Sequence, residues 1–270
     1  MTEQPQTWHY GLMARWWAEF VVDGGDELAY YQPAVERFGQ PALDLACGTG
    51  RLLVPMRRAG LDVDGCDISA DMIALCRERA DREGVTPALS VQAMHELDLP
   101  REYRTIYVCG AFGIGGHREH DREALRRCYD QLAPGGTLIF DHHLPYEDPE
   151  AWRSWLPEER GKLPRPWPEP QAGNRRRAAN GDELELSFRR VDLDPLEQRA
   201  TMQMRCSLWQ QGKLITQEER TIQLNPYFRN EVLLFLELAE FSDVAVYRHL
   251  SQEPASPDDR VIVFVARKAS

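Results

Sequence analysis

The chain has 270 residues, 43% of them hydrophobic, which is enough to enclose a complete α/β core and one sizeable insertion. Its 43 acidic residues outnumber the 32 basic ones, and the formal net charge of -11 disfavours a bulk nucleic-acid partner. No run of about 18 apolar residues occurs, and residues 1–6 lack the basic and apolar pattern of a secretory signal. We therefore expect a cytoplasmic protein with no membrane contact. Its six cysteines form no C-x-x-C pair and are expected to be reduced thiols.

Residues 8–20 and 26–38 have the spacing of two helices, and Asp26 is predicted to cap the second. From Pro41 onward, β-like runs alternate with helical runs. Strand and helix in alternation predict a parallel sheet with right-handed crossovers and helices on both faces. The expected strands are residues 42–46, 62–66, 88–92, 105–109 and 137–141, and the expected helices between them are residues 52–59, 70–84 and 122–132.

The alternation stops after residue 143. Prolines at seven positions from Leu144 to Pro170 are incompatible with regular structure over most of that segment. The run Arg175-Arg176-Arg177 is interpreted as a solvated loop. Beyond it, three long runs predict an inserted antiparallel sheet with hairpin turns, and a helix and two strands complete the core. The three runs are residues 182–192, 197–210 and 213–224, the turns are Asp194-Pro195 and Gln211-Gly212, and the final elements are residues 227–239, 243–247 and 261–266.

A glycine-rich turn follows the first expected strand of the core, in Asp44-Leu45-Ala46-Cys47-Gly48-Thr49-Gly50. At the carboxyl end of a central parallel strand, Gly48 and Gly50 let the backbone approach a ligand that a Cβ atom would exclude. A dinucleotide-binding turn needs a third glycine or alanine for close packing of its helix, and Leu53 stands there instead. A nicotinamide-dependent oxidoreductase is therefore disfavoured, although it stays an alternative.

A second acidic residue, Asp67, ends the next expected strand, about 20 residues beyond the glycines. A carboxylate at this place can accept both hydroxyl groups of an adenosine ribose, which neutral side chains reproduce poorly. Asp67 is therefore the leading candidate for a binding residue.

The two motifs together resemble the first two motifs of class I S-adenosylmethionine (SAM)-dependent methyltransferases. The resemblance continues through residues 94–100 and 132–138, and it covers roughly residues 41–141. The insertion that ends in Asn225-Pro226-Tyr227-Phe228-Arg229 is similar to that of small-molecule N-methyltransferases of the aminosugar dimethyltransferase and glycine N-methyltransferase kind. The resemblance implies SAM as cofactor, with S-adenosylhomocysteine (SAH) as product.

The implied fold is a Rossmann-like, seven-stranded, mostly parallel sheet with helices on both faces, an N-terminal helical cap and an inserted antiparallel sheet. The chain is accordingly expected to divide into four segments. They are a cap at 1–40, a SAM-binding core at 41–143, a Pro-rich loop and β insertion at 144–225 that serves as acceptor lid or dimer contact, and the C-terminal completion of the core at 226–270.

The resemblance also assigns cofactor contacts to individual residues. The turn of Ala46, Cys47, Gly48 and Gly50 would hold the methionine part of SAM, supported by Asp44, and Asp67 would bind the ribose. Ile68 and Met72 would flank the adenine, Met94 and His95 would contact its edge, and Cys109-Gly110 would lie beneath the amino-acid end. The sequence departs from the family at Ala46 and Ala93, which replace a glycine and an acidic residue, so the adenine contacts rest on backbone and on Met94 or His95.

Methyl transfer from a sulfonium is an in-line displacement that mainly needs alignment of the reactants and exclusion of water. The candidate bases for a hydroxyl or ammonium acceptor are His142 and His143, at the end of the fifth strand, and Tyr10 before the core. The alternative interpretations are a structural histidine pair and an aromatic residue packed on the core. No metal site is predicted, because His117 and His120 have no matching carboxylate or thiolate pair nearby.

The sequence therefore predicts transfer of a methyl group from SAM to an N or O nucleophile of a small-molecule acceptor. Trp152, Trp155, Trp167 and Tyr227 would supply apolar or cation-binding surface to that acceptor, or to an interface. A non-catalytic SAM-binding or interaction module and a macromolecular methyltransferase remain alternatives. A homodimer is left open.

Overall fold

The computed structural model of the chain describes residues 7, 9–169 and 173–270. The chain divides into two compact units. The insertion unit comprises residues 1–22, 114–116 and 148–226, and the core unit comprises residues 23–113, 117–147 and 227–270. Residues 1–40, expected as one cap, contribute to both units. Residues 1–6, Trp8 at the expected start of the first helix, and Pro170 lie outside the described residues.

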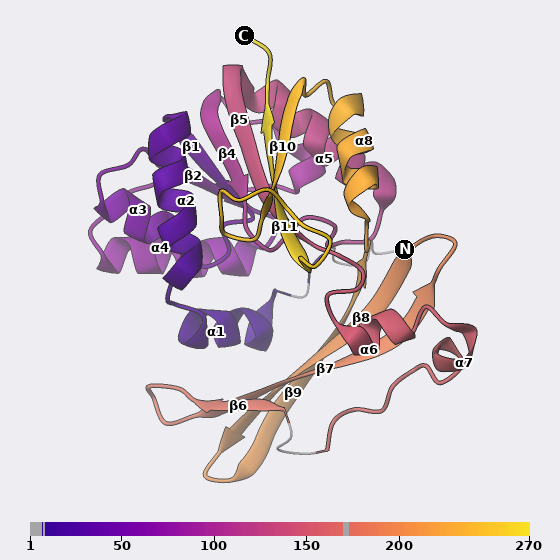
Figure 1. Ribbon diagram of the computed structural model, residues 1–270. Helices are drawn as coiled ribbons and strands as arrows, with labels where there is room; N and C mark the ends of the chain where they lie inside the picture. Colours follow the sequence, from indigo (N-terminus) through magenta and orange to yellow (C-terminus); the bar gives the residue numbers. More distant parts are fainter. Residues whose placement is uncertain (1–6, 8, 170–172) are drawn as a thin grey trace. The chain divides into compact units, whose positions relative to one another are not determined.

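The core unit contains a seven-stranded sheet with the order β10-β11-β5-β4-β1-β2-β3 (Figure 1). The pairings among β1 to β5 are parallel, whereas β11 runs antiparallel to both β5 and β10. The predicted seven-stranded, mostly parallel sheet is therefore confirmed. Its strands are β1 Ala42–Leu45, β2 Val63–Asp67, β3 Leu89–Val91, β4 Tyr103–Val108, β5 Leu132–His143, β10 Asp243–Arg248 and β11 Val261–Arg267.

Helices cover both faces of this sheet, with α2, α3 and α4 on one face and α5 and α8 on the other (Figure 1). Alternate residues of β5 enter the two apolar layers, because successive strand side chains point to opposite faces. Phe140 joins the layer under α5 and α8, and Ile139 joins the layer under α2, α3 and α4. The helices are α2 Gly25–Phe38, α3 Leu53–Arg58, α4 Ala70–Arg82, α5 Arg118–Gln131, α8 Arg229–Leu238 and the short 3₁₀ helix η1 Met94–Glu96.

Two local expectations for the core differ from the structure. The helix α5 begins at Arg118, one turn before the expected start at residue 122. The predicted cap Asp26 is wrong, because the N-cap position of α2 is Gly24 and Asp26 lies in the first turn. The carboxylate that meets this helix start is Asp23, which accepts a hydrogen bond from the Gly25 N–H at 3.0 Å.

The insertion unit contains a separate antiparallel sheet with the order β6-β7-β8-β9, which confirms the predicted inserted sheet. The helix α1 covers one face of it, where Met13 and Trp16 pack against Leu184, Met204 and Ile222. The elements of this unit are α1 Gly11–Phe20, α6 Pro149–Arg153, α7 Pro157–Arg160, β6 Asn174–Arg177, β7 Glu183–Asp194, β8 Arg199–Gln210 and β9 Lys213–Leu224.

Two segments interpreted as irregular contain regular structure. The arginine run forms the strand β6, because Arg175 and Arg177 both form ion pairs with Glu183 of the neighbouring strand. The Pro-rich connection contains two short helices that begin at Pro149 and Pro157. Proline is tolerated at a first helical position, where its missing N–H would have no helical partner. Across the residues that the structure describes, no helix is long and apolar enough to cross a membrane.

Candidate cofactor site

The turn after β1 leaves one open position and one closely packed position. Ala46, Gly48 and Gly50 all have positive φ angles, of 67°, 54° and 76°. A Cβ atom added at Gly48 would meet no atom within 4 Å. A Cβ atom at Gly50 would lie 2.6 Å from the Cys76 Sγ of α4. Gly48 therefore borders open space, whereas Gly50 lets the turn pack on a helix.

Asp67 lies at the carboxyl end of β2, immediately beside this turn. One of its carboxylate oxygens accepts the Gly48 N–H at 2.9 Å, and the other accepts the Ser69 N–H at 2.8 Å. Burial raises the pKa of Asp67, and the hydrogen bonds from Ser69 and Gly48 oppose that rise. Each carboxylate oxygen has a second lone pair, so Asp67 keeps acceptors for two hydroxyl groups while the backbone fixes its orientation.

Asp44 lies at the end of β1 and is only 3% exposed. Burial raises its pKa to about 7, although a hydrogen bond with Tyr107 and the nearby charge of Arg51 lower it in part. Arg51 forms an ion pair with Glu27 at the start of α2, and its guanidinium also contacts the Cys109 Sγ at 3.8 Å. Arg51 therefore links the ends of β1 and β4 to α2, a role that the sequence analysis missed.

The ends of β4 and β5 are joined by Asp141, another residue that the sequence analysis did not assign to the site. Its Oδ1 accepts the Gly110 N–H at 2.8 Å and the Tyr31 hydroxyl at 3.0 Å. Gly110 has a φ of 67°, and a Cβ atom there would meet nothing within 4 Å. The signal in the sequence was the position of Asp141 at a strand end, the same position that Asp44 and Asp67 occupy. Its partners are 31 and 110 residues away along the chain, so they could not be read locally.

The residues predicted to contact adenine differ in their environments. Ile68 is half-buried and Met72 is 2% exposed. Met94 packs partly buried against the core layer under α5. The ring of His95 stacks on His120 of α5, with ring centroids 3.9 Å apart and planes within 6°. The structure thus places His95 between η1 and α5, and the adenine contacts of all four residues stay predictions.

The two histidines at the end of β5 point to opposite faces of the strand. His142 is 3% exposed, its Nε2 lies 3.0 Å from the Tyr227 carbonyl, and its buried Nδ1 has no hydrogen-bond partner. Burial lowers its pKa to about 4, so the ring is neutral near pH 7. If Nε2 carries the proton and donates to Tyr227, then Nδ1 is a free acceptor. His143 is half-exposed, and its Nδ1 lies 2.6 Å from the Glu147 carboxylate.

Tyr10 and the predicted acceptor aromatics fall partly in the insertion unit. Tyr10 is the N-cap residue of α1, and its catalytic role stays a prediction. The ring of Trp167 already has two cations of its own, because the guanidinium carbons of Arg205 and Arg189 lie 3.9 and 4.6 Å from its centroid. In the core unit, Tyr227 is fully buried and donates its hydroxyl hydrogen to Asp121 at 2.6 Å. Trp167 and Tyr227 are therefore engaged within the protein itself.

The histidines His117 and His120 lie with ring centroids 5.0 Å apart at the start of α5. Within residues 7, 9–169 and 173–270, no group of three or more His, Cys, Asp or Glu side chains has the arrangement of a metal site. The absence of a metal stays a prediction.

The position of the site agrees with the comparison to known families. Residues 42–136, which contain the glycine turn, Asp67 and the end of β4, match the family described as a methyltransferase domain. These residues are therefore similar to methyltransferase domains. The chain is 28% identical over 145 residues to a protein of Geobacillus sp. (strain WCH70) that is described as a methyltransferase, an alignment that covers 51% of this chain and 59% of the relative. The chain spans about half the length of the curated relatives it matches.

Solved structures share the fold over nearly the whole chain. A SAM-dependent methyltransferase from Clostridium acetobutylicum is similar with a TM-score of 0.70 and 15% identity, covering 95% of this chain and 98% of that one. CalS10, an amino pentose methyltransferase from Micromonospora echinaspora, is similar with a TM-score of 0.64 and 20% identity, covering 97% and 99%. At these identities the likeness establishes the Rossmann-like fold with its insertion, and nothing about the acceptor.

Proposed function

We propose that the protein binds SAM at the carboxyl edge of the core sheet and transfers its methyl group to a nitrogen or oxygen of a small molecule. The observation that carries this proposal is Asp67, a buried carboxylate held by the N–H groups of Gly48 and Ser69. Beside it, Gly48 and Gly110 border open space that a Cβ atom would enter. This arrangement suits a ribose with two hydroxyl groups and a chain that lies along the glycine turn.

The residues present fit the cofactor, which supplies an electrophilic methyl group on a sulfonium when bound. Asp67 would hold the ribose, and the turn at Ala46, Cys47 and Gly48 would hold the methionine part. Asp141 would position the Gly110 backbone beneath the amino-acid end. A nicotinamide dinucleotide fits less well, because Leu53 is fully buried and its Cδ1 lies 2.6 Å from where a Gly65 Cβ would stand. The helix and strand are already in close contact there without the small residue that a dinucleotide turn requires.

His143 is the better candidate for the base that takes a proton from the acceptor. Its Nδ1 lies within hydrogen-bond distance of Glu147, which can fix the ring, and its Nε2, 3.8 Å from the Asp141 Oδ2, can accept a proton. His142 is buried and its pKa is lowered to about 4, so it is a weak proton acceptor near neutral pH. Its free Nδ1 is suited instead to accept a hydrogen bond from the acceptor.

A small acceptor is favoured over a nucleic acid because the chain is acidic overall, with a formal net charge of -11. CalS10 is an amino pentose methyltransferase, which makes aminosugars the first class of acceptor to screen. A SAM-binding module without transferase activity is the second candidate. Methyl release from labelled SAM in the presence of an aminosugar panel separates the two.

Calorimetric titration with SAH, beside NADH, tests the cofactor part of the proposal. We expect the wild-type chain to bind SAH alone and the variant Asp67→Asn to bind it at least about 30-fold more weakly, because an amide offers one acceptor oxygen instead of two. Asp81→Asn, which changes an exposed carboxylate of α4, is the matched control and should bind SAH like the wild type. Binding of NADH instead, or equal affinity in the Asp67 variant, would refute the site.

A further inference from the structure

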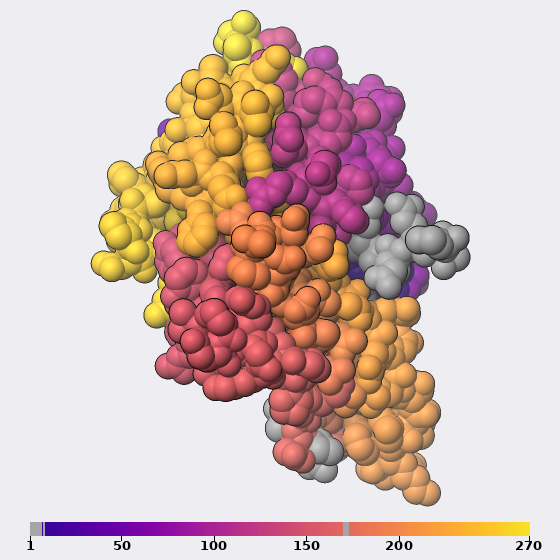
Figure 2. Space-filling view, turned by 90° about the vertical axis from the view of Figure 1, so that its right-hand side faces the viewer, coloured from indigo at the N-terminus to yellow at the C-terminus, as the bar shows by residue number. Residues whose placement is uncertain are grey.

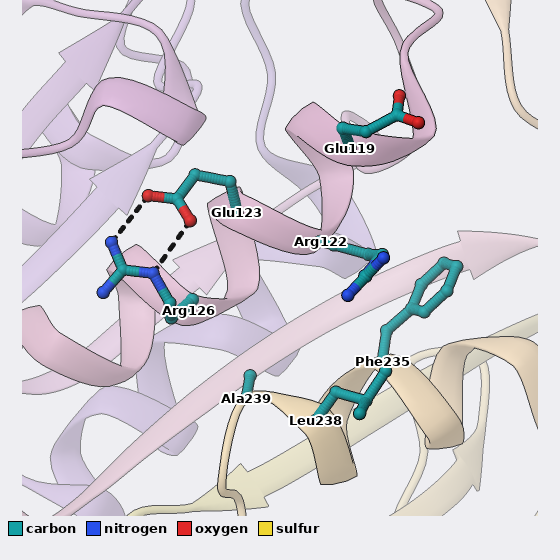
Figure 3. A pocket seen from close by; sticks show the side chains of 7 residues that line it. All are labelled: Glu119, Arg122, Glu123, Arg126, Phe235, Leu238 and Ala239. Carbon is teal, nitrogen blue, oxygen red and sulfur yellow. Dashed lines mark hydrogen bonds and ion pairs between the residues drawn. The ribbon is translucent and has the colours of Figure 1, made fainter.

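A hollow of about 250 Å³ lies between α5 and α8 in the core unit, away from the glycine turn (Figure 3). Its α5 wall is charged and its α8 wall is apolar. In Figure 3, the Arg122 side chain extends from α5 toward the side of the hollow where Phe235 lies. The lining residues are Glu119, Arg122, Glu123 and Arg126 from α5, and Phe235, Leu238 and Ala239 from the end of α8.

Only some of the charged side chains of the α5 wall form ion pairs within the protein. Glu123 accepts hydrogen bonds from both Arg126 and Arg127, and Arg126 also contacts Asp130 at 2.5 Å. Arg122 and Glu119 are exposed, and neither has an ion pair with any residue that the structure describes. In Figure 3 the Glu119 carboxylate lies apart from the Arg122 guanidinium. The guanidinium of Arg122 is therefore the positive charge that the hollow offers to an anionic group.

Beside the hollow, α8 presents an uncovered apolar stripe. Leu234 and Leu238, four residues apart and hence on one helix face, are 51% and 57% exposed. Figure 2 faces this side of the molecule and shows the gold surface of the α8 region next to the magenta surface of the α5 region. Within the described part of the chain, an arginine without an ion pair thus lies beside two half-exposed leucines on one helix face.

A negative charge lies on the other side of the same stripe. Successive residues of a helix are about 100° apart around its axis. Phe235 therefore lies on the side of the leucine stripe that faces the hollow. Glu237, one residue before Leu238, lies on the opposite side of the stripe, away from α5. Glu237 is exposed and has no ion pair within the described part of the chain. The surface thus runs from Arg122 across the leucines to Glu237, which places a guanidinium at one margin and a carboxylate at the other.

We infer that this surface is an interface between two copies of the chain, in which Glu237 of each copy enters the hollow of the other and meets Arg122. A twofold axis that runs along α8 places two α8 helices side by side and parallel, with leucine against leucine and each arginine against a glutamate. A twofold axis across α8 would make the helices antiparallel and would bring Arg122 against its own copy, which like charges oppose. The charge pattern therefore selects the parallel arrangement.

The contact is small, so the dimer is expected to be weak and to depend on concentration. Sedimentation velocity of the 270-residue chain between about 1 and 500 µM tests this, a range in which weak dimers form. We expect the wild-type chain to associate, and the single variants Arg122→Glu and Glu237→Arg each to associate at least about 10-fold more weakly, because each creates two like-charge contacts. Arg77→Glu and Glu78→Arg on α4 are charge-matched controls and should behave like the wild type.

Mixing the two single variants gives the sharpest test. In a mixed dimer of the parallel kind, the glutamate introduced on α5 of one copy meets the arginine introduced on α8 of the other, and the unchanged Arg122 and Glu237 meet each other as well. The mixture should therefore recover the association that each variant alone has lost. A wild-type chain that stays monomeric, single variants that dimerise normally, or a mixture that stays monomeric would each overturn the inference. Circular dichroism of every variant confirms that a loss of association is not a loss of fold.

Discussion

The carboxyl ends of β1, β2, β4 and β5 form the cofactor edge, where we propose that SAM binds. This edge and the inserted sheet are stabilised in different ways. At the cofactor edge, polar side chains bind the backbone of neighbouring turns, as when Asp67 accepts the N–H of Gly48. In the inserted sheet, one face packs against α1 and the other is held by cross-strand pairs such as Arg205 with Glu219. The first arrangement fixes the direction of individual carboxylates and leaves open space beside them. The second fixes a surface, and its side chains are already paired with one another.

The largest effect is expected where the cofactor turn meets α4. Gly50→Ala forces a Cβ atom to within 2.6 Å of the Cys76 Sγ at a φ of 76°. We expect it to lower the free energy of unfolding by about 3 to 4 kcal/mol, the sum of overpacking and a left-handed alanine. Gly60→Ala, also at positive φ but with nothing within 4 Å, should lose about 1 kcal/mol in the same denaturant titration. Equal losses would show that the Cys76 contact carries no strain.

Next in size is an apolar truncation in the inserted sheet. Leu186 is 2% exposed beneath α1, and Leu186→Ala should cost about 3 kcal/mol of stability through the cavity it leaves. The affinity for SAH should not change, because this residue supports the insertion unit only. Leu196→Ala, at a hairpin tip that is 93% exposed, should cost less than about 0.5 kcal/mol. A large loss of SAH affinity in Leu186→Ala would mean that the two regions are not independent.

A smaller effect separates binding from stability within the cofactor edge itself. Gly48→Ala meets no protein atom, so its stability loss should equal that of Gly60→Ala. Its Cβ atom would occupy the space assigned to the cofactor, and we expect SAH to bind about 100-fold more weakly, which corresponds to about 2.7 kcal/mol. Calorimetry measures the affinity and denaturant titration the stability. Unchanged affinity would place the ligand elsewhere.

The smallest effect concerns the pH dependence of stability. Burial lowers the pKa of His142 from 6.5 to about 4. Between these two pH values His142 binds a proton in the unfolded chain and stays neutral in the folded chain. Stability is therefore lost as the pH falls from about 6.5 toward 4. His142→Gln should remove this loss, about 1 to 2 kcal/mol between pH 7 and pH 5, while keeping a donor for the Tyr227 carbonyl.

The difference between the pH profiles of the wild type and His142→Gln reports on His142 alone, because the other groups with shifted pKa values are present in both proteins. His9 has its pKa lowered to about 4 and adds a loss of the same sign. Asp44 has its pKa raised to about 7, so it contributes in the opposite direction and stabilises the fold as the pH falls through that value. Parallel pH profiles for wild type and His142→Gln would contradict the assigned pKa shift.

The glycine turn and the strand end at Asp67 could be located from the sequence because their signals are local. Asp67 and Gly48 are 19 residues apart, and a strand, a turn and a helix of ordinary length bring them together. Glycine permits close approach of a ligand to the backbone and a carboxylate accepts two hydroxyl groups, so the kind of ligand could be inferred from these two residue types. The strand β6 was missed because Arg175-Arg176-Arg177 has no apolar alternation, and only its pairing with Glu183 makes it a strand.

The missed site residues depend on contacts between distant segments. Tyr31 lies 110 residues from Asp141 along the chain and donates a hydrogen bond to it, and Arg51 forms an ion pair with Glu27 of α2, the helix before the first strand. No periodicity or motif specifies such a pair, because either residue alone has an ordinary role at a helix surface or a strand end. The prediction of Asp26 as a cap was wrong for a local reason. Two aspartates lie close together in the sequence, and the backbone turn at Gly24 and Gly25 determines that Asp23, not Asp26, accepts the hydrogen bond at the start of α2.

A crystal structure of the chain with SAH would test the central claim most directly. The account predicts both ribose hydroxyls within hydrogen-bond distance of the Asp67 carboxylate and the amino-acid part along Gly48 and Gly110. A ribose bound away from Asp67, or SAH that fails to enter this edge of the sheet, would contradict it.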